Sequence, residues 1–397
     1  MEDMLVVLKT GATEAQAKVP VHLNTTLSCV PHYTIISDYE EEIGGVRTHD
    51  VLRDVTRPKV TEAAEQPEEF ALYDRLRARG RQGLLREDWR GSSNSNGEGE
   101  QEEENGPFGK SSNRGWRLDK WKFLPMLDRA LQVRPTAQWY IFVEADTYVV
   151  WANLVAWLRQ LDAAHAYYLG APMQSGDAVF AYGGAGIVLS QAAVRRVVEF
   201  GARRPDVVAT RMAQHWAGDA ILGRVLQEDV GVPLVWAWPM LQTSRAWELD
   251  SFGEGYGRAP WCYPAVSYHH MTPEDVETLW RFEREWFQEE QNAVLLHGDV
   301  FKGLLFNRTA PHQDDWDNLA SAHETGRRVN SLDECALACD DDPRCLQFSF
   351  RNGTCMTSPS VIRGVRRRGV QSGWMPARIE AAVRDIDSCP ETEYILG

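Results

Sequence analysis

The chain has 397 residues, a formal net charge of −15 and 10% aromatic residues, among them 15 tryptophans. This length is enough for a sizeable catalytic domain and a small additional module. Because no basic excess exists, the composition argues against a nucleic-acid or anionic-membrane partner, both of which require a positive surface.

The first segments alternate between strand and helix. Residues 4–8 and 33–37 are apolar runs that predict two buried strands. Between them the pattern predicts a helix over residues 13–29, kinked or interrupted at Pro20. A strand, a helix and a strand begin an α/β nucleotide-binding half, in which ligands lie at the carboxyl ends of the strands.

Three residues follow those strand ends. Thr10 and Gly11 form the turn after the first strand, and Asp38 ends the second. We therefore expect all three residues to lie near a nucleotide. For Asp38, a helix cap or a turn residue is the alternative.

Two helical segments and a low-complexity segment come next. Residues 66–86 and 116–131 predict helices, and the acidic stretch 91–113 predicts a surface loop that cannot contribute to a core. Within the second helix, Lys120 is a candidate contact for a phosphate group. A surface lysine is the alternative interpretation.

An apolar, aromatic run then leads into an acidic turn. Residues 139–143 predict a central strand. Glu144 and Asp146 follow at positions i and i+2, a spacing that points both carboxylates the same way at the end of a strand. Such oxygen ligands suit a hard divalent cation that bridges a diphosphate. A solvated acidic turn is the alternative.

Further candidates lie downstream. Gly183 and Gly184 predict a close backbone approach or a tight turn before a helix that starts near residue 191. Asp219, three residues after Trp216, is either a catalytic carboxylate or the N-cap of a helix that runs to residue 226. In the stretch 266–270, two adjacent histidines on a strand would point to opposite faces, so we expect only one of them to bind a metal.

Three blocks in order, residues 144–149, 181–190 and 266–269, resemble the β1,3-glycosyltransferases of family 31. The closest likeness is to core 1 β3-galactosyltransferases and Fringe in their fungal form. The resemblance extends over about residues 4–290. The metal motif of that family has consecutive aspartates; here the last is kept as Asp146 and the middle one is replaced by Ala145.

The resemblance implies a GT-A type domain, a Rossmann-like mixed sheet with flanking helices, over residues 1–303. It implies that Asp146 and His269 hold Mn²⁺ or another divalent cation, with Glu144 helping through the metal shell or the ribose. Asp219 would act as the base, although Gly218 replaces the first acid of the family's pair. The remaining implied contacts are Thr10, Gly11, Asp38, Lys120, Glu144 and Ala145 for the nucleotide sugar and Gly183, Gly184 and Trp216 for the donor and acceptor wall.

The implied reaction transfers a sugar, first of all galactose, from a UDP donor to a glycan or glycoprotein acceptor in β1,3 linkage with inversion. The alternatives are a UDP-GlcNAc donor and a non-catalytic, glycan-binding or chaperone-like relative. Relatives are mostly anchored in the Golgi membrane, so we expect the secretory pathway, and the Golgi lumen in particular. No run of about 18 or more apolar residues occurs, so we expect no transmembrane helix in this chain.

The C-terminal part carries four clustered cysteines. A polar linker over residues 304–329 precedes a module over residues 330–397, which begins with a capping-box signature at Ser331. Spacing alone permits three disulfide pairings, and a zinc site is a further alternative. The pattern resembles a PAN/Apple domain, and that resemblance implies the pairs Cys335–Cys355 and Cys339–Cys345. It also implies a glycan or protein partner for the module, with a stabilising appendage as the alternative. The pairing of Cys29, Cys262 and Cys389 is left open.

Overall fold

The structure is a computed structural model that describes residues 1–55, 68–89, 114–290, 294–320, 327–386, 388–389 and 392–396. The acidic loop predicted over residues 91–113 lies outside this part of the chain. The chain divides into two compact units. We call residues 1–243, 267–280 and 395–397 the α/β unit, and residues 244–266 and 281–394 the disulfide unit.

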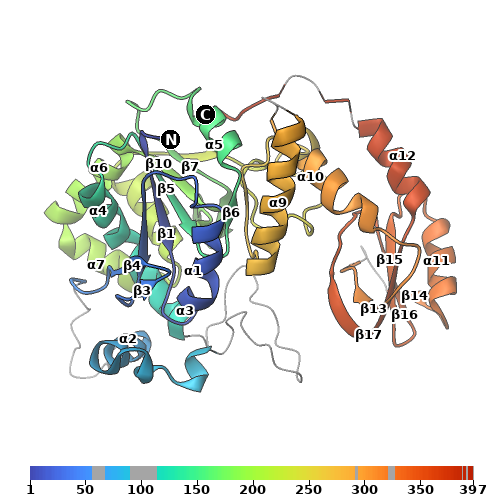
Figure 1. Cartoon of the computed structure of the whole chain (residues 1–397), viewed down its shortest axis with the longest axis horizontal. Helices are drawn as coiled ribbons and strands as arrows, with labels where there is room; N and C mark the ends of the chain where they lie inside the picture. The colour runs from blue at the N-terminus through green and yellow to red at the C-terminus, as the bar shows by residue number, and fades with distance from the viewer. Residues whose placement is uncertain are drawn as a thin grey trace. The chain divides into compact units, whose positions relative to one another are not determined.

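A mixed eight-stranded sheet forms the centre of the α/β unit (Figure 1). Its strands, in spatial order, are β11 (Leu234–Trp236), β7 (Tyr168–Gly170), β10 (Ile187–Ser190), β5 (Trp139–Glu144), β1 (Met4–Lys9), β2 (Tyr33–Ser37), β4 (Val46–Asp50) and β3 (Glu42–Ile43). β5, β1, β2 and β4 are parallel to one another, whereas β10 runs antiparallel to both β5 and β7. The predicted mixed α/β sheet is confirmed, including its two first strands and the central strand.

Helices cover both faces of this sheet. Figure 1 shows α4 and α6 on one side of the sheet and α1 on the other. The helices of the α/β unit are α1 (Ala15–Asn24), α2 (Glu68–Arg79), α3 (Arg114–Asp119), α4 (Phe123–Val133), α5 (Trp151–Leu158), α6 (Gln191–Arg203), α7 (Pro205–Gln214) and α8 (Gly218–Arg224).

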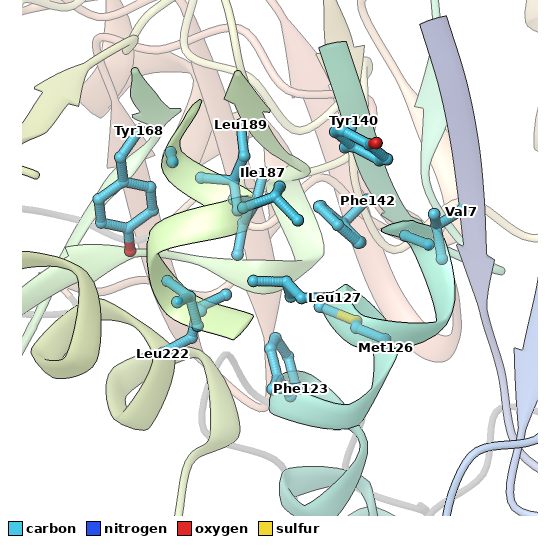
Figure 2. Close-up of a cluster of buried hydrophobic side chains, with 14 of the residues drawn as sticks. Val7, Phe123, Met126, Leu127, Tyr140, Phe142, Tyr168, Ile187, Leu189 and Leu222 are labelled. Atoms are coloured by element: carbon cyan, nitrogen blue, oxygen red, sulfur yellow. The ribbon is translucent and has the colours of Figure 1, made fainter. Parts of the chain in front are cut away.

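Alternation along the strands builds the core under α4, α6 and α8. Tyr140 and Phe142 of β5 point to the same face, as i and i+2 residues of a strand must. They pack with Leu127 of α4 in one buried cluster (Figure 2). Each such fully buried side chain contributes about 1.5–3 kcal/mol relative to an exposed one. This core fixes the position of β5, whose carboxyl end carries the acidic turn.

Three predicted helices differ from the observed ones. The helix expected over residues 66–86 ends at Arg79 as α2, and two 3-10 turns follow it. α1 is shorter than expected and continues through Pro20, which therefore neither ends nor interrupts it. The helix expected over residues 116–131 is divided into α3 and α4 by a 3-10 turn, η3 (Lys120–Lys122). This tighter turn matters for the site because it buries Lys122, which is 2% exposed.

Two small strand pairs lie beside the large sheet. β6 (Tyr148–Val149) pairs with β12 (Ser267–Tyr268), and β8 (Pro172–Ser175) pairs with β9 (Ala178–Ala181). The helix α9 (Pro273–Glu289) follows β12, and Thr272 caps its first turn: the N–H of Asp275 donates to Oγ1 of Thr272. The β6–β12 pair brings two segments about 120 residues apart in the chain together, because Tyr148 lies opposite Tyr268.

The disulfide unit has a five-stranded antiparallel sheet. Its strands, in spatial order, are β13 (Gln313–Asp317), β17 (Val365–Trp374), β15 (Gln347–Arg351), β16 (Thr354–Ser358) and β14 (Arg327–Arg328). Its helices are α10 (His297–Leu304), α11 (Leu332–Asp340) and α12 (Pro376–Ile386). β13 belongs to the stretch 304–329 that was expected to be a linker, and it pairs with β17.

Three disulfides lie within this unit. The expected bonds Cys335–Cys355 and Cys339–Cys345 are both present, so the zinc alternative is wrong for these cysteines. A third bond joins Cys262 to Cys389, which are 127 residues apart in the sequence. The buried cysteines pack with Leu332 and Phe348 in a small core of their own. Such covalent links are typical of small extracellular modules that cannot bury a large core.

Candidate functional site

The carboxyl ends of β1 and β5 lie side by side. In this parallel pair Lys9 is the register partner of Glu144, and the N–H of Ala145 donates to the Lys9 carbonyl. The next strand is held in the same way, since the N–H of Thr10 donates to the carbonyl of Ile36. Three polar strand ends therefore meet at one edge of the sheet, as ligand-binding residues do in open α/β sheets.

A buried ion network connects these strand ends. The Lys9 ammonium contacts Asp119 and lies 3.1 Å from Glu144 Oε1. The Lys122 ammonium lies 3.2 Å from Asp119 Oδ1 and 3.0 Å from Asp38 Oδ2. Burial alone would lower the pKa of both lysines, but the surrounding carboxylates raise it, so both lysines stay charged.

Lys9, Lys122 and Asp119 were not predicted as site residues. The signal for Lys9 was a lysine at the end of an otherwise apolar strand. Asp119 and Lys122 stand three residues apart in an aromatic helical segment, a spacing that puts both on one side of a helix. Neither signal distinguishes a buried ion pair from a solvated one.

Asp38 fixes the turn after β1. Its Oδ1 accepts a hydrogen bond of 2.8 Å from the N–H of Ala12, and the Lys122 ammonium also donates to the carbonyl of Thr10 at 2.8 Å. A Cβ on Gly11 would lie 3.1 Å from both Asp38 Oδ2 and Lys122 Nζ, so the ion pair leaves little room for a side chain there. Thr10, Gly11 and Asp38 thus form one packed group at the strand ends, and their place near a nucleotide stays a prediction.

Asp146 and the two histidines form the candidate metal centre. Asp146, His269 and His270 each offer one ligand atom, and these atoms lie within 4.8 Å of one another. The Oδ1 of Asp146 is 3.3 Å from Nδ1 of His269. This separation fits two ligands on one cation with bonds of about 2.1 Å. A carboxylate with imidazole nitrogens suits a transition ion such as Mn²⁺.

Lys18 of α1 pairs with the other carboxylate oxygen of Asp146. Its ammonium lies 3.0 Å from Asp146 Oδ2 and 2.8 Å from Glu14 Oε2. Burial alone would raise the pKa of Asp146, but Lys18 and the two histidines outweigh burial and hold that pKa well below its usual range. Asp146 is therefore ionised at any working pH. Lys18 is a further residue that sequence reasoning missed.

Glu144 lies apart from this group. Its carboxylate pairs with Lys9, and burial raises the pKa of Glu144 to about 7 while Lys9 opposes that rise. Between Glu144 and Asp146, the Ala145 carbonyl accepts a 2.8 Å hydrogen bond from Nε2 of His22. A carbonyl can only accept, so His22 carries its proton on Nε2, and burial lowers the pKa of His22 and keeps it neutral. His22 thus holds the acidic turn in place.

The two predicted glycines form a short 3-10 turn, η4 (Gly183–Ala185), that packs against His269. A Cβ on Gly184 would lie 2.3 Å from Nε2 of His269, so only glycine fits against this ring. The Gly184 carbonyl accepts a 2.7 Å hydrogen bond from the Thr147 hydroxyl, which also lies 3.4 Å from His269 Nδ1. The glycine turn, the metal turn and the histidine are therefore one packed unit.

Asp219 lies on the other side of the glycine turn. Its Oδ2 accepts a 2.9 Å hydrogen bond from the N–H of Gly183, and its Oδ1 accepts one from Ala220. The N-cap of α8 is Ala217, so the expected alternative of Asp219 as an N-cap is wrong. Burial raises the pKa of Asp219 to about 6, the two N–H donors lower it, and the charge of Glu144 raises it further.

Packing explains the glycine that replaces the first acid of the family's pair. A Cβ on Gly218 would lie 2.3 Å from Cδ2 of Phe123 and 2.7 Å from Cα of Lys120. The start of α8 therefore touches the backbone of η3, and no larger residue fits. The Lys120 ammonium lies 5.0 Å from the centre of the Trp121 ring. A surface lysine can make this contact too, so the contact does not favour a phosphate-binding role for Lys120.

Trp216 presents an aromatic surface shortly before Asp219. It is 40% exposed, and its ring stacks on that of Trp116 at 5.3 Å and on that of His215 at 5.7 Å. The indole is therefore part of a stack of three rings. Trp116, which precedes η3, was not predicted to take part.

One known family matches part of the α/β unit. Residues 121–246 match the sequence model of the family described as Fringe-like, a stretch of 126 residues that includes Glu144, Asp146, the glycine turn and Asp219. The match covers about a third of the chain and is consistent with glycosyltransferase family 31, whose members transfer a sugar from a donor to a glycan acceptor. No curated protein matches the chain. Fringe-like enzymes work in the secretory pathway. Among the described residues, no helix is both long and apolar enough to cross a membrane.

Proposed function

We propose that the protein is an inverting, metal-dependent glycosyltransferase that moves galactose from a UDP donor to a glycan or glycoprotein hydroxyl in β1,3 linkage. The observation that carries this proposal is the pair of adjacent glycines between two functional side chains. The Gly183 N–H donates to Asp219, and a Cβ on Gly184 would collide with His269. A candidate base and a candidate metal centre thus both contact one turn, whose first two residues have no side chains.

In this proposal Asp146 and His269 hold the cation, and the turn at Thr10 and Gly11 contacts the nucleotide. A divalent cation such as Mn²⁺, when bound there, would offset the charge that grows on the leaving diphosphate. Glu144 pairs with Lys9, which precedes the Thr10 turn, and the charge of Glu144 also acts on Asp219. We assign it to the ribose or to the outer shell of the cation.

Asp219 acts as the base. As the acceptor hydroxyl attacks the anomeric carbon, its proton passes to an Asp219 carboxylate oxygen, the bond to the diphosphate breaks, and the configuration inverts. Each of the two oxygens accepts one backbone N–H and keeps a further lone pair for the hydroxyl. A pKa near 6 suits this role, because a general base works best when its pKa is close to the working pH.

A non-catalytic, glycan-binding relative is the second candidate. The loss of the middle aspartate at Ala145 and of an acid at Gly218 favours it. Gly218 carries less weight than the sequence suggested, because packing against Phe123 and Lys120 explains it without reference to catalysis. A UDP-GlcNAc donor is the alternative within the same enzyme class.

Ligand-induced stabilisation tests the donor, since a ligand that binds only the folded protein raises its melting temperature. We expect UDP-galactose with Mn²⁺ to give the largest shift among UDP-sugars. Transfer to a panel of glycan acceptors tests the chemistry. Asp219→Asn should lower kcat by about 10²–10⁴-fold, and Asp146→Ala should abolish both transfer and the Mn²⁺-dependent shift.

Asp128→Asn is the matched control, because this exposed carboxylate of α4 contacts Gln132 rather than the site. It should transfer sugar as the wild type does. Full activity of Asp219→Asn would remove the base assignment. A wild-type protein that binds no UDP-sugar would favour the glycan-binding candidate.

A further inference from the structure

The backbone at His270 has an unusual conformation. Its φ is +58°, in the left-handed region that non-glycine residues seldom adopt. On a regular strand, two adjacent side chains point to opposite faces, and His270 would then face away from His269. Here the strand β12 ends at Tyr268, and the centres of the two imidazole rings lie only 4.0 Å apart. The left-handed residue thus turns both rings toward the same side.

The surrounding backbone holds this turn at both ends. Before it, Tyr268 pairs with Tyr148 in the β12–β6 ladder. After it, the N–H of Met271 donates a 2.9 Å hydrogen bond to the carbonyl of Asp146. Both contacts are made to the segment that carries the acidic turn. An uncommon backbone conformation persists when its surroundings fix it, and such residues concentrate at functional sites.

The side chains that meet there are those of a cation site. The ligand atoms of Asp146, His269 and His270 lie within 4.8 Å of one another, and His269 Nδ1 is 3.3 Å from Asp146 Oδ1. The second oxygen of Asp146 is taken by Lys18. Asp146 therefore offers the cation one oxygen, and the chain has no second carboxylate at Ala145, where the family's motif has an aspartate.

We propose that His270 is the third protein ligand of the cation and replaces the missing aspartate. This inference rests on the metal site of the proposed function and deepens it. The ligand set becomes two imidazoles and one carboxylate, instead of a site dominated by oxygen. Imidazole suits transition ions, whereas Mg²⁺ prefers oxygen ligands and its own waters. The site consequently selects ions such as Mn²⁺ and Co²⁺ over Mg²⁺.

Metal binding by the full chain tests the proposal without relying on activity. The visible absorption of Co²⁺ reports nitrogen ligands, and competition against Co²⁺ gives the affinity for Mg²⁺, each measured with and without UDP. The variants are His270→Asn, His269→Asn and Asp146→Asn. Asparagine tolerates the left-handed conformation better than most residues, so the turn should be retained. His165→Asn, at an exposed histidine that pairs with Asp162, is the control.

We expect His270→Asn to weaken Co²⁺ binding by about 10-fold or more, which is the range found even when the partners of metal ligands are removed. Its affinity for Mg²⁺ should change by less than about 2-fold, so the preference for Co²⁺ falls, and His165→Asn should match the wild type. Circular dichroism and thermal melting check that each variant is folded.

The proposal is overturned if folded His270→Asn binds Co²⁺ like the wild type, or if the wild type binds no Co²⁺ in either condition. These results are distinct from failure of the proposed function. If the wild type transfers sugar and His270→Asn keeps the Co²⁺ spectrum, the proposed function stands and His270 is not a ligand. If His270→Asn loses Co²⁺ binding and the wild type transfers no sugar, His270 is a ligand and the transferase proposal is wrong.

Discussion

The two compact units contain different kinds of specific buried interaction. In the α/β unit, buried lysines and carboxylates are paired at the edge of the sheet where the candidate site lies. In the disulfide unit, three covalent links surround a small core. Among the described residues, no disulfide lies in the α/β unit.

This difference has a physical reason. Buried ion pairs contribute little net stability, because each ion loses its hydration on burial. They do fix the positions of charged groups, which a site for a diphosphate requires. A disulfide restricts the unfolded chain and makes no such demand on nearby charges. We infer that the α/β unit uses its charges for geometry, whereas the disulfide unit uses its links for stability.

The largest effect is expected from removal of a buried charge. Lys122→Met keeps an unbranched side chain of similar length but leaves Asp38 and Asp119 without one of their cations. Breaking a buried pair in this way costs about 3–5 kcal/mol of unfolding free energy. Hydrogen exchange measured during a urea titration should show the lost stability in peptides of the α/β unit.

Lys302→Met in the disulfide unit is the matched control. Lys302 is 38% exposed on its side chain and pairs with Asp299 one turn away, so its removal should cost less than about 1 kcal/mol. Equal effects of the two changes would contradict the comparison between the units.

Removal of a disulfide should act on the other unit. Replacing Cys335 and Cys355 by serine opens a link between residues 20 apart, which costs about 3 kcal/mol in the chain-entropy account. The Cys339–Cys345 link closes only 6 residues and should cost about 2 kcal/mol. Hydrogen exchange should report lost protection in α11, β15 and β16. Equal loss of protection in β1 and β5 would mean that the two units do not unfold separately.

A methyl group at the glycine turn should disturb the site. Gly184→Ala places a Cβ 2.3 Å from His269 Nε2, and such overpacking costs about 1–3 kcal/mol. Because the ring must move, Co²⁺ affinity should fall together with the melting temperature. Gly201→Ala in α6 is the control: its nearest contact is Val208 at 4.0 Å, and alanine favours a helix by up to about 1 kcal/mol. If Gly184→Ala binds Co²⁺ normally, His269 does not hold the cation in this orientation.

The smallest effect concerns pH. With Asp219 as the base, kcat/KM should fall below about pH 6, where this carboxylate takes up a proton. Because the pKa of Glu144 is about 7, this group is mostly protonated where Asp219 titrates, so Glu144→Gln should leave that limb nearly in place. Disappearance of the limb in Glu144→Gln would assign the base role to Glu144.

The raised pKa of Asp219 also predicts a pH dependence of stability. The folded pKa of Asp219 lies above its ordinary value of 3.8, so the folded protein binds this proton more tightly than the unfolded chain. The contribution of Asp219 to stability therefore falls as pH rises between about 4 and 6. The Asp219→Asn variant should lack this part of the pH dependence in urea denaturation.

Local patterns in the sequence determined much of the fold. The apolar run before Glu144 predicted β5. Asn352-Gly353 is a typical turn sequence, and it forms the turn between β15 and β16, where both residues have positive φ. Ser331 predicted the start of α11, and its side chain accepts a hydrogen bond from the N–H of Glu334. These features depend on residues a few positions apart, so the sequence displays them directly.

The tertiary structure alone decided which polar residues are buried together. Lys18 meets Asp146 across 128 residues, Cys262 meets Cys389 across 127, and Gly218 is required by contact with Phe123. His270 is the clearest case: alternation along a strand predicted that it faces away from His269, whereas a left-handed backbone turns it back. Periodicity specifies which face a residue occupies on a regular element. It cannot specify where that element ends, because distant backbone contacts determine the end.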